Sequence, residues 1–531
     1  MASRRDELNA YTFARKRMVG AFLQPSGGGN DEDAPRPVRA VLPSIVVGAV
    51  IVAGFGMWGV IKPAAPLHWD EGKNIIQGKT STTRYVLLPE GEGANRHMVL
   101  HQVLNMSSAR LVLPAGAQVM IVADDVLDKY KWRGATIGIP YAPDKLPKDT
   151  DAGQTKTWSV CDRLTADANT QAAVNQAVFV AAGDEQKTLA DPKRRVGDGQ
   201  SLFVMGPQPG NPPDNLSKFL VDGNGVRHAV GTDGSKETKS SLERALFGDG
   251  AQAQQVTADW LGTLANGSAI TFPTIPGFDP AKQVASSLTQ ISKPEDRKVG
   301  RLLSFQKSAY YVVGVDRLFQ VTPFQAELIR LDPALKLVYG GASPTFADMS
   351  PADRDALQSK IDPAGMAAAK DLPTDKAPAI NIGKDARNVI CSSFDGIDNK
   401  TVKRSVWAGT EYPATFSSGS ASAHVTPGHG VLYRAFDGDN PQDGSGSDFL
   451  ITETGLRYSL PANNDGGQGG ASPTAPAAPD QAPGDKKEAN ESQARLGYKS
   501  VAPVMVPGPW SRLVPAGPVL DTNTAVQAQN A

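Results

Sequence analysis

The chain has 531 residues, of which 40% are hydrophobic, and its 54 basic residues almost balance its 55 acidic ones. With a net charge of −1 it has no excess of basic residues of the kind that marks nucleic-acid-binding proteins, so we expect no nucleic-acid partner. The length is sufficient for one or two folded cores and for terminal segments besides.

The stretch from Ala40 to Ile61 is apolar and contains no charged side chain. As a helix rising about 1.5 Å per residue, it would be roughly 33 Å long, enough to cross the hydrocarbon core of a bilayer. Trp58 stands near its end, where an aromatic ring can settle at the interface. The stretch is too long and begins too late for a signal peptide. We therefore predict a transmembrane helix over residues 40–61; the alternative is a buried helix of a soluble domain.

Basic residues set the expected orientation of this helix. Those before it are Arg4, Arg5, Arg15, Lys16, Arg17, Arg36 and Arg39, whereas only Lys62 and Lys73 follow closely. Because positive residues resist translocation, the N-terminus is expected in the cytoplasm and the bulk of the chain outside it. This predicts a single-pass protein of the plasma membrane, with a cytoplasmic tail over 1–39 and an exported domain over 62–462.

The tail itself has the pattern of a helix from Ser3 to Leu23, in which Ser3 and Asp6 resemble a capping box. A stripe with three-to-four residue spacing combines apolar side chains with one arginine: Leu8, Tyr11, Arg15, Met18 and Phe22. One short helix cannot bury such a stripe by itself. We expect it to dock on another protein; the alternative is that it lies on the inner leaflet, helped by its basic residues.

The only cysteines are Cys161 and Cys391, both in the exported part. Two thiols in an oxidising compartment most simply form one disulfide, and the alternative is a pair of buried, unbonded thiols. A bond closing so long a loop would stabilise the fold by about 5 kcal/mol in the chain-entropy model.

Short apolar runs separated by Gly, Pro, Asp and Asn predict a β-rich α+β domain. Four passages have the layout of a hairpin: 84–88 with 98–100, 219–223 with 226–230, 310–313 with 317–321, and 449–453 with 455–458. Helical patches are expected at Gln102–Arg110, Thr257–Leu264, Pro323–Leu331 and Ala352–Ile361. Isolated hairpins are marginally stable, so these units are expected to pack together or on a common centre.

The composition changes at residues 463–493, which lack aromatic side chains and are rich in Gly, Ala, Pro and Asp. Such a segment cannot bury enough apolar surface to fold, so we predict a disordered linker there. Apolar residues return afterwards, and we expect residues 494–531 to pack back on the exported domain.

One stretch resembles a nucleotide-binding loop, with Lys73, Lys79 and Thr80 as the residues that would contact phosphate. A phosphate-binding loop needs four residues between its glycines and a helix after it, whereas Gly72 and Gly78 have five between them and a strand is expected next. The histidines show no zinc-ligand spacing, so no metal site is predicted. No catalytic nucleophile with its base stands out either, and we predict no catalysis by the chain itself.

Several short motifs follow one another along the chain: Ser3–Leu8 with Ala10–Tyr11, Val103–Asn105 with Ser108–Leu111, Arg133–Gly134 with Ile137–Pro140, Trp158–Asp162, Cys391, Pro427–Gly428, Leu496–Tyr498 and Gly517–Asp521. In this order they resemble the motifs of the EccB family, the membrane components of actinobacterial type VII (ESX) secretion systems. The linker at 463–493 departs from the family pattern. The resemblance implies four β-rich repeats around a central β core, tied by a Cys161–Cys391 disulfide.

The resemblance further implies assembly with the motor ATPase EccC, the membrane proteins EccD and EccE, and the mycosin protease, and self-association of the exported domain. The expected function is thus that of a structural component linking the cytoplasmic and exported parts of a protein-export machine. Family members are often described as ATPases, so ATP hydrolysis, with ATP as ligand, is the first alternative. A cell-wall-binding anchor is the second.

Overall fold

The computed structural model describes residues 4–23, 37–61, 65–166, 172–207, 215–231, 235–366, 371–415, 423–438, 441, 446–461 and 490–529. The predicted linker lies outside these residues except for its last few positions, and so does Ser3. The chain divides into two compact units, a smaller one of residues 1–69, 78–82 and 120–130 and a larger one of all other residues.

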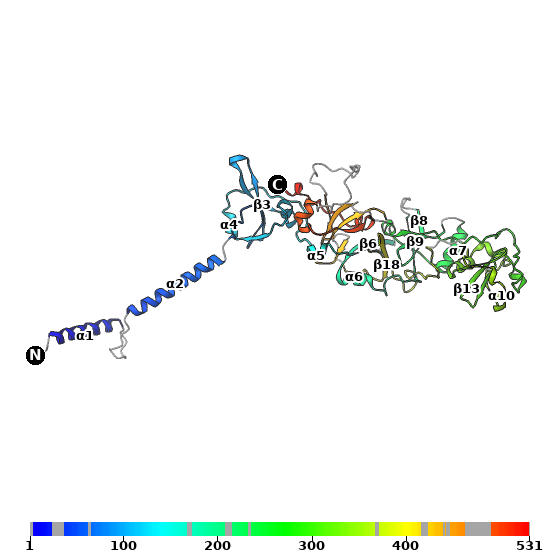
Figure 1. Ribbon diagram of the computed structural model, residues 1–531, viewed down its shortest axis with the longest axis horizontal. Helices are drawn as coiled ribbons and strands as arrows, with labels where there is room; N and C mark the ends of the chain where they lie inside the picture. Colours follow the sequence, from blue (N-terminus) through cyan, green and yellow to red (C-terminus); the bar gives the residue numbers. More distant parts are fainter. Residues whose placement is uncertain are drawn as a thin grey trace. The chain divides into compact units, whose positions relative to one another are not determined.

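Two long helices begin the smaller unit, α1 (Arg4–Leu23) and α2 (Pro37–Ile61) (Figure 1). The extent of α1 agrees with the predicted tail helix. Pro37 occupies the first position of α2, where a missing N–H costs nothing. Among the described residues, none of the helices combines the length and apolarity needed to cross a membrane. The short helix α4 (Asp124–Asp128) also belongs to this unit.

The larger unit is built mainly of strands, and one chain topology recurs in it. We call this topology a module: three antiparallel strands, a connection, a strand parallel to the first, a short helix, and a segment parallel to the third. Modules 2 and 3 show it completely, because β10 runs parallel to β7 and β11 to β9, while β15 runs parallel to β12 and β16 to β14.

The elements of module 2 are β7 (Leu202–Pro207), β8 (Leu216–Val221), β9 (Val226–Ala229), α7 (Lys236–Phe247), β10 (Gln254–Gln255), α8 (Ala258–Gly262) and β11 (Ala265–Asn266). Those of module 3 are β12 (Leu302–Phe305), β13 (Ala309–Val313), β14 (Leu318–Val321), α9 (Pro323–Arg330), β15 (Phe346–Asp348), α10 (Pro351–Ala356) and β16 (Ile361–Asp362).

Modules 1 and 4 follow this order less completely. In the larger unit, module 1 contains β1 (Ile75–Gly78, whose last residue falls in the smaller unit), β2 (Arg84–Glu90), β3 (His97–Val103) and α3 (Met106–Val112), and its final segment bridges β3 in parallel at Arg133 and Ile137. The strand β4 (Val119–Val122) belongs to the smaller unit from Met120 onward. Module 4 contains β20 (Val431–Phe436), β21 (Ser447–Ile451), β22 (Arg457–Leu460), α11 (Glu491–Gln493), η5 (Ala494–Tyr498), β23 (Val504–Pro507) and α12 (Gly508–Arg512). Its β23 is parallel to β20, and Ala516 bridges Arg457 of β22 in parallel.

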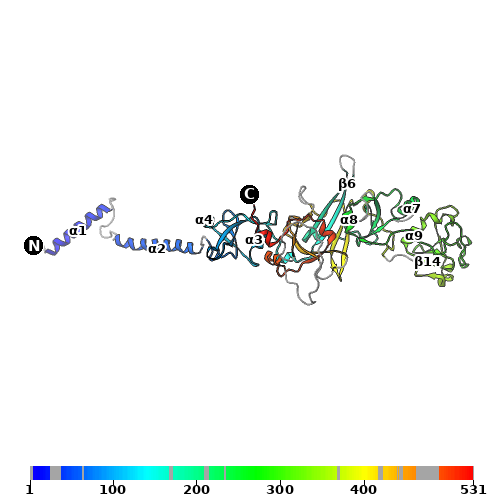
Figure 2. The ribbon, with the colours of Figure 1, turned by 90° about the horizontal axis from the view of Figure 1, so that it is seen from above.

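The strands of a larger sheet lie between these modules along the chain. Its strands are β5 (Thr157–Ala166), β6 (Ala172–Ala181), β17 (Val389–Asp398), β18 (Thr401–Gly409) and β19 (Ala423–Val425), in the order β18-β17-β5-β6-β19. We call it the central sheet. The hairpin β5–β6 lies between modules 1 and 2 along the chain, and β17–β18 lies between modules 3 and 4, so the sheet joins both halves (Figure 2).

The remaining short helical elements connect these parts. They are η1 (Gly93–Asn95), α5 (Asp149–Ala152), α6 (Gly183–Ala190), η2 (Pro294–Asp296), η3 (Pro333–Leu337), η4 (Gln358–Lys360) and α13 (Thr522–Ala525).

Shared hydrophobic cores hold the modules together. One core combines Trp158 of the central sheet with Trp260 of module 2 and Trp510 of module 4, all fully buried. A second joins module 1 to module 4 and includes Leu496 and Leu520 from the C-terminal residues. A third core joins the helices α7 and α9 of modules 2 and 3. Because each module buries part of its apolar surface against another, the larger unit is expected to be stable only as a whole.

The four predicted hairpins are confirmed as β2–β3, β8–β9, β13–β14 and β21–β22. The prediction for Gln102–Arg110 was wrong at its start, since β3 continues to Val103 and the helix begins only after Asn105. The Asn105 side chain caps it by accepting a hydrogen bond from the Ser108 amide, 2.9 Å away. The patch ending at Ile361 was also too long, because Ile361 pairs with Leu318 as a strand.

A packing detail repeats in three modules. The ring of His101 in β3 covers Gly134, that of His228 in β9 covers Gly267, and that of Tyr458 in β22 covers Gly517. A Cβ atom at these glycines would lie 2.1, 2.5 and 2.5 Å from the nearest ring atom. Only glycine therefore fits beneath the ring.

Candidate functional site

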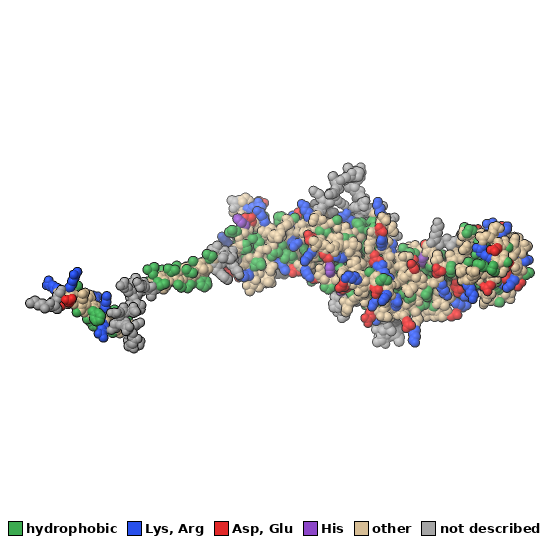
Figure 3. Space-filling model, turned by 60° about the horizontal axis from the view of Figure 1, so that its bottom comes forward, with side chains coloured by type: hydrophobic (Ala, Val, Ile, Leu, Met, Phe, Trp, Pro, Cys, Tyr) green, Lys and Arg blue, Asp and Glu red, His purple; other side chains and the backbone are tan. Residues whose placement is uncertain are grey.

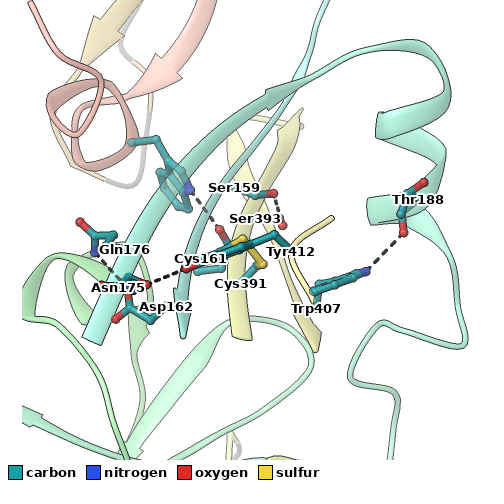
Figure 4. The surroundings of a disulfide bond; sticks show 12 residues. Ser159, Cys161, Asp162, Asn175, Gln176, Thr188, Cys391, Ser393, Trp407 and Tyr412 are labelled. Carbon is teal, nitrogen blue, oxygen red and sulfur yellow. Dashed lines mark hydrogen bonds between the residues drawn. A yellow bond between two sulfur atoms is a disulfide. The ribbon is translucent and has the colours of Figure 1, made fainter. Parts of the chain in front are cut away.

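Cys161 and Cys391 form the predicted disulfide bond in the middle of the central sheet (Figure 4). They stand directly opposite each other on the antiparallel strands β5 and β17, with their Cα atoms 4.0 Å apart. Both are fully buried, in a small core with Phe179 and Trp407. The bond therefore joins the two hairpins of the central sheet, which come from distant parts of the chain.

Two hydrogen-bonded contacts accompany the disulfide. The hydroxyl groups of Ser159 and Ser393 lie 2.6 Å apart, two residues along the same strands (Figure 4). The Trp407 indole N–H donates to the carbonyl of Thr188 at 3.3 Å. The first contact adds a second link between β5 and β17, and the second holds β18 on α6.

Asp162, next to the disulfide, is a fully buried carboxyl group that connects the central sheet to module 2. It accepts hydrogen bonds from the Thr257 amide at 2.7 Å, from the Thr257 hydroxyl at 2.8 Å and from the Gln176 amide at 3.2 Å. Burial raises the pKa of Asp162 to about 6, against the opposing effect of these hydrogen bonds. Thr257 is the N-cap of α8, so one carboxyl group fixes the start of that helix on the sheet.

A turn after β19 is tied to its surroundings by two carboxylates. Glu185 accepts a hydrogen bond from the Thr426 hydroxyl at 2.5 Å and lies 3.1 Å from Nε2 of His424. Asp151 lies 2.8 Å from Nδ1 of His429 and accepts a bond from the buried ammonium of Lys156 at 2.6 Å. Burial alone would raise the pKa of Asp151, but its bonds to Lys156 and His429 lower it overall. His424 in β19 and His429 after it thus connect this segment to α6 and α5.

The residues of the candidate nucleotide loop have other partners. The Lys73 ammonium lies 3.0 Å from the carboxylate of Glu71. The Thr80 amide donates to the carboxylate of Asp124 at 2.7 Å, and the Lys79 amide donates to the carbonyl of Val122 at 2.9 Å. The amide groups that would face a phosphate thus already bind protein oxygens, and the chain continues into β2 rather than into a helix.

The predicted docking side chains of α1 are all exposed. Tyr11 is 70% and Phe22 is 92% exposed, Leu8 and Met18 are similarly open, and no residue of α1 is buried. Arg15 lies within the same stripe. Figure 3 shows hydrophobic side chains at the surface of both α1 and α2. The described residues therefore leave the apolar side of α1 without a cover.

A small cavity lies in module 3. Its volume is about 140 Å³, and it is lined by apolar side chains and by Ser292, Lys293, Asp296, Asp348, Ser350 and Asp353. Asp353 is already bonded to Ser292, and Asp348 to Ser304. No group of ligands suited to a metal ion occurs in the described part of the chain.

Sequence reasoning missed the Asp162 contact, because its partners lie far away in the chain and carry no local signal. The repeated ring-on-glycine contacts were missed for the same reason. The cysteines were found, since two cysteines in a segment predicted to be exported leave one simple pairing.

Comparisons with known proteins give a consistent result. A family model described as "Type VII secretion system ESX-1, transport TM domain B" matches residues 1–531. The ESX-3 secretion system ATPase EccB3 of Mycobacterium tuberculosis is 25% identical over 456 residues, which cover 81% of this chain and 76% of that protein. EccB3 of Mycolicibacterium smegmatis is 25% identical over 525 residues, covering 93% and 85%. The ESX-1 secretion system ATPase EccB1 of Mycobacterium tuberculosis is 26% identical over 336 residues, covering 62% of each chain.

Solved structures share the fold. A chain of an intact ESX-5 inner membrane complex superposes with a TM-score of 0.56 at 17% identity, covering all of this chain and 96% of that one. A chain of the EccB3 dimer from the ESX-3 core complex gives a TM-score of 0.54 at 21% identity, covering 86% of this chain and all of that one. Because the family model matches its full length, the chain belongs to the EccB family of type VII (ESX) secretion systems.

Proposed function

We propose that this chain is a structural component of a type VII secretion membrane complex, in which it links cytoplasmic docking to an exported assembly domain. The observation that carries the proposal is the arrangement of the chain. An exposed helix with an apolar stripe, α1, is followed by the apolar helix α2 and then by a large disulfide-bonded domain.

The membrane span is part of this proposal and would be provided by α2. Its residues from Ala40 to Ile61 carry no charge, and its helix of 25 residues would be roughly 38 Å long. The basic residues before it favour a cytoplasmic N-terminus. In this topology the disulfide lies on the oxidising side of the membrane, where such bonds persist.

The apolar side of α1 is proposed to bind a cytoplasmic domain of the same complex, with the motor ATPase EccC as the first candidate. Leu8, Tyr11, Met18 and Phe22 would supply the contact, and Arg15 could pair with an acidic residue of the partner. Binding would remove from water the apolar surface that the described chain leaves open.

The exported domain is proposed to act as a rigid assembly surface, in contact with EccD, EccE, the mycosin protease and a second copy of itself. Two features support rigidity: modules share their cores, and the disulfide joins the two halves at the central sheet. One of the related structures is a dimer of EccB3, which makes self-association a reasonable expectation for this chain.

Co-purification from native membranes tests the proposal. The full chain should bring down EccC and EccD in mild detergent, whereas Tyr11→Asp, which places a charge in the exposed apolar stripe, should lose EccC and keep self-association. Thr12→Asp is the matched control, because Thr12 is exposed on the same helix and makes hydrogen bonds only to the backbone of Leu8 and Asn9. A monomer that brings down no membrane component would refute the proposal.

A further inference from the structure

The smaller unit contains a cluster of loops that follows α2 closely in the chain. Its segments are the stem at residues 65–69, the turn at 78–82 and the stretch at 120–130. The ring of Trp69 packs edge-on against Tyr130 with centroids 5.6 Å apart. The Lys79 amide bonds to Val122 and the Thr80 amide to Asp124, so the turn is fixed on the third segment. These contacts connect the stem to Tyr130 and the turn to the start of α4.

This cluster exposes large apolar side chains that its own packing does not use. Leu67 is 83% exposed, and Ile121 in β4 is 58% exposed. Its neighbour Val122 is fully buried, so the alternation of β4 directs Ile121 outward. Half-buried Trp69 and Tyr130 accompany them. Aliphatic side chains together with Trp and Tyr are the composition that proteins place at a membrane interface.

The length of the connecting chain limits how far this cluster can be from the end of α2. Leu67 follows Ile61 by six positions, and at about 3.6 Å per residue the two can be at most roughly 22 Å apart. Trp69, which packs on Tyr130, is only two positions further along. If α2 spans the bilayer, the cluster is therefore held beside the headgroup layer.

The charged side chains of the cluster are compatible with a position beside the lipid headgroups. The Asp124 carboxylate accepts hydrogen bonds from Ser81 and Thr80, which lower its pKa, so this negative charge is already bound by protein groups. The exposed side chains of Lys79 and Lys129 are available to lipid phosphates, while Asp125 and Asp128 are exposed as well. Nearly balanced charge with exposed apolar groups favours headgroup contact over purely electrostatic attraction.

We propose that Leu67, Trp69, Ile121 and Tyr130 form a foot that rests on the outer lipid headgroup layer and sets the orientation of the exported side of the protein on the membrane. The proposal rests on the membrane span of α2 proposed above. The proposed partner of the foot is the lipid surface. Binding of a protein to these side chains instead would overturn the proposal.

Single-cysteine reporters on the full-length chain test this. The native cysteines are buried and bonded, so a dye will react with an added cysteine alone. Reporters at Leu67→Cys and Ile121→Cys carry an environment-sensitive dye in nanodiscs of phosphatidylcholine and phosphatidylglycerol with headgroup spin labels. Val50→Cys within α2 reports on the span, and Val315→Cys, exposed in the turn between β13 and β14, is the matched surface control.

We expect the spin labels to quench Leu67→Cys and Ile121→Cys at least threefold more than Val315→Cys, while acyl-chain labels quench Val50→Cys. If Val50→Cys is quenched and Ile121→Cys behaves like Val315→Cys, the foot is refuted and the membrane span remains. If Val50→Cys is not quenched either, the proposed span itself fails. Protection of Ile121→Cys only when other complex components are present would assign the surface to a protein.

Discussion

Replacing Asp162 by asparagine removes a buried charge from the contact between the central sheet and module 2. The pKa of Asp162 rises from its ordinary value of 3.8 to about 6 in the folded protein, mainly because of burial. The folded chain therefore holds this proton more tightly than the unfolded chain does. Above pH 6 the ionised group costs about 3 kcal/mol of stability, and this cost disappears as the pH falls below 3.8.

Asparagine cannot titrate, and its carbonyl oxygen can keep the bonds donated by Thr257. Its NH2 group cannot accept from the Gln176 amide, but Gln176 retains its bond to the Thr257 hydroxyl. Asp162→Asn should accordingly be more stable than the wild type by up to about 3 kcal/mol at pH 7.5. At pH 4.5 the advantage should shrink by about 2 kcal/mol, which is roughly a thirtyfold change in the opening equilibrium.

Hydrogen exchange of peptides covering β5 and α8 measures this locally, and comparing variant with wild type at each pH removes the intrinsic exchange rates. Asp198→Asn, at an exposed position just before β7, is the control and should change protection little at either pH. An advantage of Asp162→Asn that is equal at pH 4.5 and pH 7.5 would refute the reasoning.

Further predictions concern the disulfide, the glycine contacts and the candidate nucleotide loop. Changing Cys161 and Cys391 together to alanine should lower the free energy of unfolding by about 5 kcal/mol in urea titrations, and a reductant should destabilise the wild type but not this variant. Gly267→Ala places a Cβ atom 2.5 Å from the ring of His228 and should cost about 1–3 kcal/mol in the same assay. Gly197→Ala, where the Cβ atom meets nothing within 4 Å, should change stability by less than about 0.5 kcal/mol. Lys79→Ala should leave any ATP turnover of the purified protein unchanged; abolished turnover would instead support the nucleotide-loop hypothesis.

The antiparallel hairpins could be predicted because their signals are local. In β8–β9, for example, the Asp222 side chain accepts hydrogen bonds from the amides of Asn224 and Val226, and residues this close in sequence leave a recognisable pattern. The Cys161–Cys391 pair was also predictable, since the sequence contains no other cysteine.

The parallel strands that complete each module could not be predicted. Strands such as β10 and β11 have two residues each, too few for any periodicity, and their partners lie tens of residues away. Asp162 looked like any other acidic residue, because its raised pKa comes from burial in the folded chain and its partner Thr257 is 95 positions away in the sequence. The predicted helix ends were wrong at two places. Asn105 caps its helix, so the helix starts later than the apolar pattern indicates, and Ile361 pairs with a strand instead of continuing a helix.

The central claim, that this chain connects the two sides of a membrane, can be tested by sidedness of labelling. In intact spheroplasts a membrane-impermeant maleimide should label Val315→Cys in the domain proposed to be exported and leave Thr12→Cys in α1 unlabelled until the cells are permeabilised. Both positions are exposed and neither belongs to the proposed docking stripe, so the membrane decides access. Equal labelling of the two positions before permeabilisation would contradict the account.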